Sequence, residues 1–132
     1  MLVVDASVAV EACLAGDFSP LGGDLVAPGL LWSEVPSVLH ELRWRGTISA
    51  SLGELALAAF LDSPIAPRRR RDLTRRAWTV ADRLGWAKTY DAEYVALAAA
   101  LECPLVTLDA RLKRRAAELA TVIGPTEVGR PQ

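Results

Sequence analysis

The sequence predicts an α/β fold in which helices cover both faces of a parallel sheet. Short continuous apolar runs, beginning with Leu-Val-Val at residues 2–4, alternate with longer segments of helical periodicity. Runs without polar alternation are typical of strands buried on both faces, and strand–helix alternation is typical of parallel sheets. The chain has 132 residues and no repeat or internal linker. We therefore expect one domain over residues 1–125, followed by a C-terminal tail over residues 126–132.

Composition excludes several classes of protein. Hydrophobic residues make up 52% and charged residues 23% of the chain, which is not the composition of a disordered protein. No apolar run approaches the roughly 18 residues of a membrane span. Asp5 and Glu11 interrupt the apolar N-terminus, which has no basic start and so does not resemble a signal peptide. Cys13 and Cys103 are too few for a disulfide framework, and we expect a cytoplasmic protein with both thiols reduced and no membrane contact.

The N-terminal part of the chain contains expected strands at residues 2–4 and 25–27. The first is followed by a helix that Ser7 is expected to cap and Gly16 to end. The second strand stops at Pro28-Gly29. Each strand therefore leads directly into a helical segment, as in a β-α unit.

The next two helices follow from apolar periodicity. The second is expected to end at Gly46, and the third covers residues 51–61 with Ser51 as its cap. Pro36 leaves two alternatives, because the second helix either begins near Ser33 with the proline in its first turn or begins earlier and kinks. Its apolar residues at helical spacing are Leu31, Val35, Val38, Leu39 and Leu42.

The remaining elements continue the strand–helix alternation. The prolines at residues 63–67 indicate a short strand at the edge of the sheet. A helix is expected from Asp72 to Gly85, and a nearly all-apolar, buried helix is expected to start at Asp91. The last elements are a strand over residues 104–109, a basic helix over residues 110–119 and a strand over residues 121–123.

Four acidic residues are expected at one edge of the sheet. Ligands of parallel α/β sheets lie beyond the carboxyl ends of the strands, and Asp5 and Asp109 each follow an expected strand. Glu34 lies at the border of an apolar helix stripe, and Asp91 opens a helix. Alternative interpretations are N-caps for Asp91 and Asp109 and a helix-dipole contact for Glu34. Asp5 is harder to explain in this way, because no Lys or Arg occurs in the first 42 residues to compensate a carboxylate in an apolar setting.

Clustered carboxylates repel one another unless a cation holds them together. Hard oxygen ligands favour Mg²⁺ or Mn²⁺, and such an ion can polarise a phosphodiester and activate water. The hydroxyls of Ser7 and Thr107 could hold a carboxylate or a metal-bound water, or could belong to an ordinary turn and strand. The pattern therefore predicts metal-assisted hydrolysis of a nucleic acid.

Basic residues concentrate in the second part of the chain. Residues 1–62 carry two basic and eight acidic side chains, whereas residues 63–132 carry thirteen basic and eight acidic side chains. The arginine clusters could bind the phosphates of RNA or a partner, or could form solvated helix faces. The tryptophans Trp44, Trp78 and Trp86 could stack on bases or pack in the protein, and His40 has no evident catalytic partner. The candidate arginines are Arg68, Arg69, Arg70, Arg71, Arg111 and Arg114.

Three blocks of the sequence resemble a known family. They are VVDASV at the N-terminus, APGLLWSEVPSVL near residue 30 and TYDAEYVALAAALECPLVTLDARL in the last third. These blocks and the length resemble PIN-domain ribonucleases, in particular the VapC toxins of bacterial toxin–antitoxin pairs. The family often has Asn three residues after its helix glutamate, where this chain has Ser37 preceded by Pro36.

The resemblance implies a PIN-like domain with the strand order 3-2-1-4-5. It also implies Mg²⁺- or Mn²⁺-dependent cleavage of single-stranded RNA, a homodimer and inhibition by a cognate antitoxin protein. The acidic quartet of the family corresponds to Asp5, Glu34, Asp91 and Asp109. In this interpretation Asp5, Asp91 and Asp109 bind the metal, and Glu34 binds a second ion or orients the attacking water.

Two alternatives belong to other classes. A catalytically silent relative would act only as an RNA-binding or protein-interaction module, but such a module has no use for four converging acids. A receiver-like phosphoacceptor domain needs an acid pair after the first strand, whereas Ala6 follows Asp5. That class also needs a lysine at a late strand end, whereas Lys88 and Lys113 lie in an expected loop and helix.

Overall fold

The computed structural model of the chain describes residues 1–129, which fold around a five-stranded sheet. Every pair of neighbouring strands is parallel, and the order is β3-β2-β1-β4-β5. The fold class and strand order expected from the sequence are therefore confirmed. The strands are β1 (Leu2–Val4), β2 (Leu25–Ala27), β3 (Ala66–Pro67), β4 (Leu105–Val106) and β5 (Val122–Ile123).

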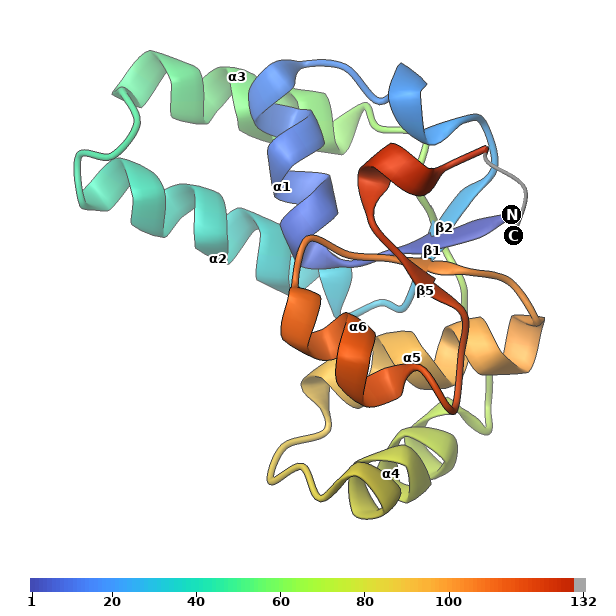
Figure 1. The fold of residues 1–132 in the computed structure, drawn as a ribbon. Helices are drawn as coiled ribbons and strands as arrows, with labels where there is room; N and C mark the ends of the chain where they lie inside the picture. Colours follow the sequence, from blue (N-terminus) through green and yellow to red (C-terminus); the bar gives the residue numbers. More distant parts are fainter. Residues whose placement is uncertain (130–132) are drawn as a thin grey trace.

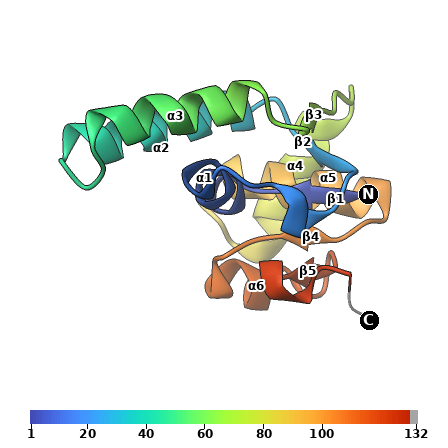
Figure 2. The ribbon, with the colours of Figure 1, turned by 90° about the horizontal axis from the view of Figure 1, so that it is seen from above.

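Helices cover both faces of the sheet. Figure 1 shows α1, α2 and α3 on one face and α4, α5 and α6 on the other, and Figure 2 shows the α2–α3 pair extending away from the sheet. This division follows from right-handed crossovers, because the chain moves outward from β1 to β3 and then in the opposite direction to β4 and β5. The helices are α1 (Ala6–Ala15), α2 (Leu31–Trp44), α3 (Ala50–Leu61), α4 (Leu73–Leu84), α5 (Tyr90–Leu101) and α6 (Ala110–Ala116), with short 3-10 helices η1 (Ser19–Leu21) and η2 (Pro125–Glu127).

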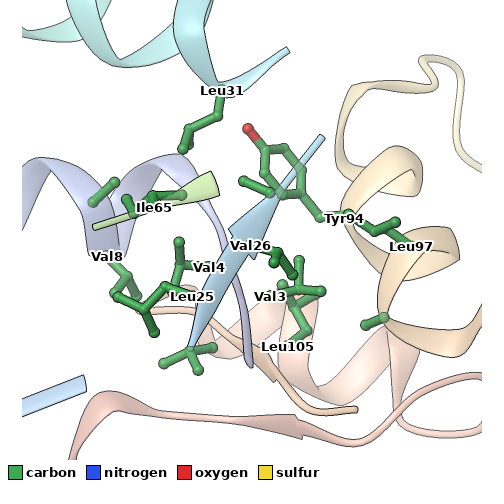
Figure 3. Packing of buried hydrophobic residues seen from close by; sticks show 14 of the residues in the cluster. Val3, Val4, Val8, Leu25, Val26, Leu31, Ile65, Tyr94, Leu97 and Leu105 are labelled. Atoms are coloured by element: carbon green, nitrogen blue, oxygen red, sulfur yellow. The ribbon is translucent and has the colours of Figure 1, made fainter. Parts of the chain in front are cut away.

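The core lies on both faces of the two central strands. Val3 and Val4 of β1 and Leu105 and Val106 of β4 are fully buried. Figure 3 shows Val3, Val4 and Leu105 in this core, with the side chain of Tyr94 directed toward Leu31 at the start of α2. Burial of apolar side chains on both faces explains why strands of two or three residues suffice to fix the sheet.

Two of the expected helix caps are wrong. The cap of α1 is Asp5, whose side chain accepts a hydrogen bond from the Val8 backbone N–H at 3.1 Å, and not Ser7. The cap of α3 is Ser49, which accepts from the backbone N–H of Leu52, and not Ser51. In both cases the cap lies two residues before the expected one and has the extended backbone that a cap requires.

Helix α2 resolves the alternatives that Pro36 left open. The helix begins at Leu31, whose backbone N–H donates to the carbonyl of Pro28 at 3.0 Å. Pro36 therefore lies inside the helix and removes the N–H that would otherwise bond the carbonyl of Trp32. The early start brings Glu34 into the first turn, close to the end of β2.

The C-terminal elements follow the expected order. The edge position of the proline-containing strand is confirmed, since β3 is the outermost strand beside β2. Residues 125–127 form η2, where Glu127 accepts hydrogen bonds from Lys113 and from the backbone N–H of Gly124. The last part of the expected tail, residues 130–132, lies outside the described residues. Among residues 1–129 no helix is long and apolar enough to cross a membrane.

Candidate active site

Asp5 follows β1 and is only 8% exposed. One carboxylate oxygen, Oδ1, accepts hydrogen bonds from the Ser7 hydroxyl at 2.6 Å and from the Val8 N–H, while Oδ2 accepts from the Thr107 hydroxyl. A buried carboxylate is costly unless donors surround it. The three donors therefore fix both the position and the orientation of this side chain.

The same hydroxyls join the ends of β1 and β4. The Ser7 hydroxyl oxygen accepts from the Leu108 N–H at 3.1 Å, and the Thr107 hydroxyl oxygen accepts from the Asp109 N–H at 3.0 Å. Each hydroxyl thus donates to Asp5 and accepts from the turn after β4. The structure places Ser7 and Thr107 as the link that fixes Asp109 relative to Asp5.

Asp109 and Asp91 have different local roles. Asp109 caps α6, and its Oδ1 accepts from the N–H groups of Arg111 and Leu112. Asp91 lies in the first turn of α5, and the cap position belongs to Thr89, so the N-cap interpretation of Asp91 is wrong. Within residues 1–129 the Asp91 carboxylate and the Oδ2 of Asp109 have no hydrogen-bond or ion-pair partner. These oxygens therefore remain available to a ligand.

Glu34 is half-buried and is held by a residue that the sequence analysis did not identify. The hydroxyl of Tyr94 donates to Glu34 Oε1 at 2.5 Å, and Tyr94 itself is 1% exposed. Figure 3 shows the Tyr94 hydroxyl directed toward the start of α2. The sequence signal was a tyrosine hydroxyl in a largely apolar helix, three residues after Asp91 and so on the same helix face.

The acids interact electrostatically as a group. Burial raises the pKa of Asp5, and the charge of Asp91 raises it further. Burial likewise raises the pKa of Asp91, with Asp109 adding to the effect, and the pKa of Glu34, with Asp91 and Asp5 adding to the effect. In the part of the chain that the structure describes, none of the four forms an ion pair with Lys or Arg. Their mutual repulsion is therefore uncompensated by the protein.

Glu93 is a fifth acid at this edge that the sequence analysis did not select. It lies in the first turn of α5, and burial together with the charge of Glu34 raises its pKa. The sequence pattern did not distinguish Glu93 from an ordinary polar residue on a buried helix. It adds to the negative potential around Glu34.

The chemistry of these donors fits a hard divalent cation. Mg²⁺ and Mn²⁺ prefer carboxylate oxygens, and several such oxygens here have no protein donor. As the side chains stand among the described residues, no three His, Cys, Asp or Glu groups are close enough together to hold an ion. Binding of a cation would thus require Asp91, Asp109 or Glu34 to turn toward the fixed Asp5 carboxylate.

The candidate arginines lie in two different places. Arg111 is the second residue of α6, close to the cap Asp109, and Arg114 is exposed on the same helix. The segment 68–71 follows β3 and leads to the start of α4. The backbone N–H of Arg68 donates to the carbonyl of Ala27 at the end of β2, and Arg70 pairs with Asp72. Among residues 1–129 the backbone N–H of Arg111 donates to Asp109, whereas no hydrogen bond or ion pair joins Arg68, Arg69, Arg70 or Arg71 to the four acids.

The tryptophans and the cysteines form no hydrogen bond with the four acids among the described residues. Trp86 is half-buried and packs under Arg115, whose guanidinium carbon lies 5.6 Å from the ring centroid. Arg115 also donates to the Leu84 carbonyl, so it anchors α6 to the loop after α4. Trp44 and Trp78 are 80% and 58% exposed. Cys13 and Cys103 are free thiols, as expected.

Comparison with known proteins identifies the family. Residues 2–118 match the PIN domain. The chain belongs to the PIN-domain family. Its relatives include VapC ribonuclease Mb0985 of Mycobacterium bovis and Ribonuclease VapC9 of Mycobacterium tuberculosis, each 39% identical over 115 residues that cover 85% of this chain and 88% of the relative. Ribonuclease VapC12 of M. tuberculosis is 35% identical over 118 residues, covering 85% of this chain and 89% of the relative.

A solved structure supports the fold of this PIN domain independently. The crystal structure of PAE2754 from Pyrobaculum aerophilum superimposes with a TM-score of 0.76 and covers 94% of this chain and 90% of its own. The sequence identity is 21%, so this likeness concerns the fold alone. The resemblance to VapC-type PIN domains that the sequence motifs indicated is confirmed by the relatives at 35–39% identity.

Proposed function

We propose that this PIN domain is a ribonuclease that hydrolyses RNA phosphodiester bonds with Mg²⁺ or Mn²⁺. The observation that carries the proposal is the group of electrostatically interacting acids at the carboxyl edge of the sheet, which no Lys or Arg among residues 1–129 neutralises. Such a group is destabilising by itself and becomes useful when a cation is bound. Relatives named as ribonucleases support RNA as the substrate.

The acids and Arg111 have different roles in the proposed reaction. Asp5, held by Ser7 and Thr107, would be the fixed ligand of the cation, and Asp91 and Asp109 would supply the oxygens that have no protein partner. When bound, a divalent cation polarises the phosphodiester and lowers the pKa of water. Glu34, held by Tyr94, is placed to accept the proton of the attacking water or to bind a second ion. Arg111, whose backbone N–H donates to Asp109 and whose side chain is exposed, would contact a phosphate of the substrate.

Cleavage by the purified protein tests this function directly. A labelled single-stranded RNA is expected to be cut in millimolar Mg²⁺ or Mn²⁺ and to stay intact in EDTA, because the acids cannot activate water without a cation. Product lengths are read on a denaturing gel, and a 5′-phosphate or 3′-phosphate on the products reports which P–O bond is hydrolysed. Equal cleavage in EDTA would contradict the metal role, and no cleavage under any metal would favour a silent RNA-binding module.

Tyr94→Phe is expected to reduce the cleavage rate about tenfold with little change in KM. The substitution removes the hydroxyl that fixes Glu34, so the carboxylate samples other rotamers during the reaction. Tyr90→Phe is the matched control, since Tyr90 is also on α5 but is 54% exposed. Steady-state kinetics and circular dichroism of both variants make the comparison, and equal rates for the two variants would exclude a positioning role for Tyr94.

We also propose that the protein is the toxin of a VapBC-type pair, acting as a homodimer that a cognate antitoxin inhibits. The names of the relatives support this role. An exposed apolar surface on α2 and α3 supports a protein partner, since Trp44 is 80% and Leu55 is 69% exposed.

Expression of the chain is expected to stop growth, because its RNA cleavage would be uninhibited, and co-expression of the protein encoded next to it is expected to restore growth. Colony counts under inducible expression make the measurement. The control is the same experiment with the Asp91→Asn variant, which should not be toxic. Toxicity that persists in that variant would separate growth arrest from the acidic site.

A further inference from the structure

The outward face of α4 carries an exposed aromatic and basic surface away from the acidic edge. Arg71, Thr74, Arg75 and Trp78 are spaced by three or four residues, so they share one face of the helix segment. They line an open hollow of about 430 Å³. A different set of α4 residues, Leu73, Ala77 and Ala81, is buried against the protein, whereas the four residues of this surface are exposed.

The charges of this surface are unsatisfied within the described residues. The neighbouring Arg70 and Arg76 both pair with Asp72, at 2.9 Å and 2.6 Å. Arg71 and Arg75, in contrast, have no acidic partner among residues 1–129 and point their charge to the side where Trp78 is 58% exposed. Around the start of α4, Arg70 and Arg76 are thus paired, whereas Arg71 and Arg75 are unpaired and line the hollow with Trp78.

We propose that this α4 surface binds a segment of single-stranded RNA, with a base stacked on Trp78 and adjacent phosphates contacted by Arg71 and Arg75. This inference rests on the proposed ribonuclease function and adds a second contact for the same substrate. An exposed indole beside cations is the combination that non-specific single-strand binding uses, since every base offers a flat face and every linkage a negative charge.

The position of α4 makes a continuous path to the acids. Leu84 ends the helix about 9 Å beyond Trp78 along its axis, at about 1.5 Å per residue. The loop 85–89 then leads to Asp91 in the first turn of α5. Figure 1 shows this loop on the same side of the molecule as the start of α6, where Asp109 lies. An RNA strand that follows α4 thus arrives at the candidate active site.

A second copy of the chain fits this surface less well. A two-fold interface is self-complementary, so it would bring the free arginines of one copy against those of the other. Their repulsion has no acidic residue on this face to offset it, apart from Asp82 one turn beyond Trp78. A polyanion meets no such repulsion.

RNA binding measured in EDTA tests the surface without requiring cleavage. The probe is a fluorescein-labelled 20-nucleotide single-stranded RNA of mixed sequence, and anisotropy gives the Kd. Trp78→Ala is expected to weaken binding about tenfold, whereas Trp78→Phe, which keeps a stacking face, stays within threefold of the parent. The double variant Arg71→Gln/Arg75→Gln is expected to reduce the slope of log Kd against log salt by about 1.4, at about 0.7 per phosphate contact.

The matched control is Arg76→Gln, which removes one positive charge from the same helix on the side away from Trp78 and should leave the Kd within twofold. Equal Kd values for Trp78→Ala and the parent would overturn the proposal. So would a change of Trp78→Ala from dimer to monomer in sedimentation with unchanged RNA affinity, because the surface would then belong to a second copy. Loss of binding in Trp78→Ala together with absent cleavage by the parent in Mg²⁺ would reject the ribonuclease function and leave the RNA surface standing.

Discussion

Asp91→Asn is expected to lower metal-dependent RNA cleavage by at least about 100-fold, corresponding to about 2.7 kcal/mol of transition-state stabilisation. Asp91 interacts electrostatically with Asp5 and Glu34, and its carboxylate has no protein partner among the described residues. The amide keeps the shape of the side chain and loses the negative charge that binds a cation. The expected loss therefore concerns the chemistry and not the fold.

The same substitution is expected to stabilise the metal-free protein. It removes one of several repelling charges and breaks no hydrogen bond, so the free energy of unfolding should rise by about 1 kcal/mol, or about 3–5 °C in Tm. An active-site substitution that abolishes activity while raising Tm is not the result of general damage. Differential scanning fluorimetry in EDTA makes this measurement alongside the cleavage assay.

Asp62→Asn is the matched control for both measurements. Asp62 is an exposed acid that follows α3 and forms no ion pair within residues 1–129, so it tests the loss of one negative charge away from both the acidic edge and the α4 surface. This control should cleave RNA at the parental rate and keep the parental Tm. If Asp91→Asn behaved in the same way, Asp91 would have no part in the reaction.

The sequence predicted the strand-end acids because a strand-end position is a local property. Asp5 and Asp109 follow short apolar runs, and parallel strands deliver their carboxyl ends to one edge. The contacts of Ser7 were not local, because its hydroxyl bonds to Leu108, about a hundred residues away in the chain. The spacing of residues therefore predicted the positions of the acids. It also predicted Ser7 as the cap of α1, whereas the cap is Asp5.

The missed and misplaced residues share the same cause. Tyr94 reaches Glu34 across 60 residues of sequence, and only the packing of α5 beside α2 creates that contact. The segment 68–71 follows a strand that ends at the carboxyl edge, yet the chain then turns toward the start of α4. The sequence left open whether its arginines bind RNA or a partner or form a solvated helix face, because periodicity carries no information on the path of a loop.

Millimolar Mg²⁺ or Mn²⁺ is expected to raise the Tm of the parent protein by several degrees. A ligand that binds only the folded state adds about 2.7 kcal/mol at a concentration 100-fold above its Kd. The structure adds a specific reason, since burial and neighbouring acids raise the pKa of Asp5, Glu34 and Asp91. The ion relieves this repulsion, whereas an equal ionic strength of NaCl only screens it.

The sign of the pH dependence follows from these raised pKa values. A carboxyl with a raised pKa holds its proton more tightly in the folded chain than in the unfolded chain. Its contribution to the free energy of unfolding therefore falls as the pH rises from the ordinary carboxyl range, near 3.8 for Asp and 4.5 for Glu, through the raised values. Above that window the acids are charged and the cost of their repulsion is complete, so stabilisation by the metal should be larger at pH 8 than at pH 5.

The double variant Asp5→Asn/Asp91→Asn separates this effect from the titration of the rest of the protein. In EDTA the Tm of the variant minus that of the parent should grow between pH 4 and pH 7, because the parent alone accumulates the repelling charges. Added Mg²⁺ should raise the Tm of the parent and leave that of the variant nearly unchanged. Two outcomes would contradict the cation site on which the proposed hydrolysis depends. One is a parent Tm that does not change with millimolar metal at pH 8, and the other is a Tm difference between variant and parent that becomes smaller as the pH rises.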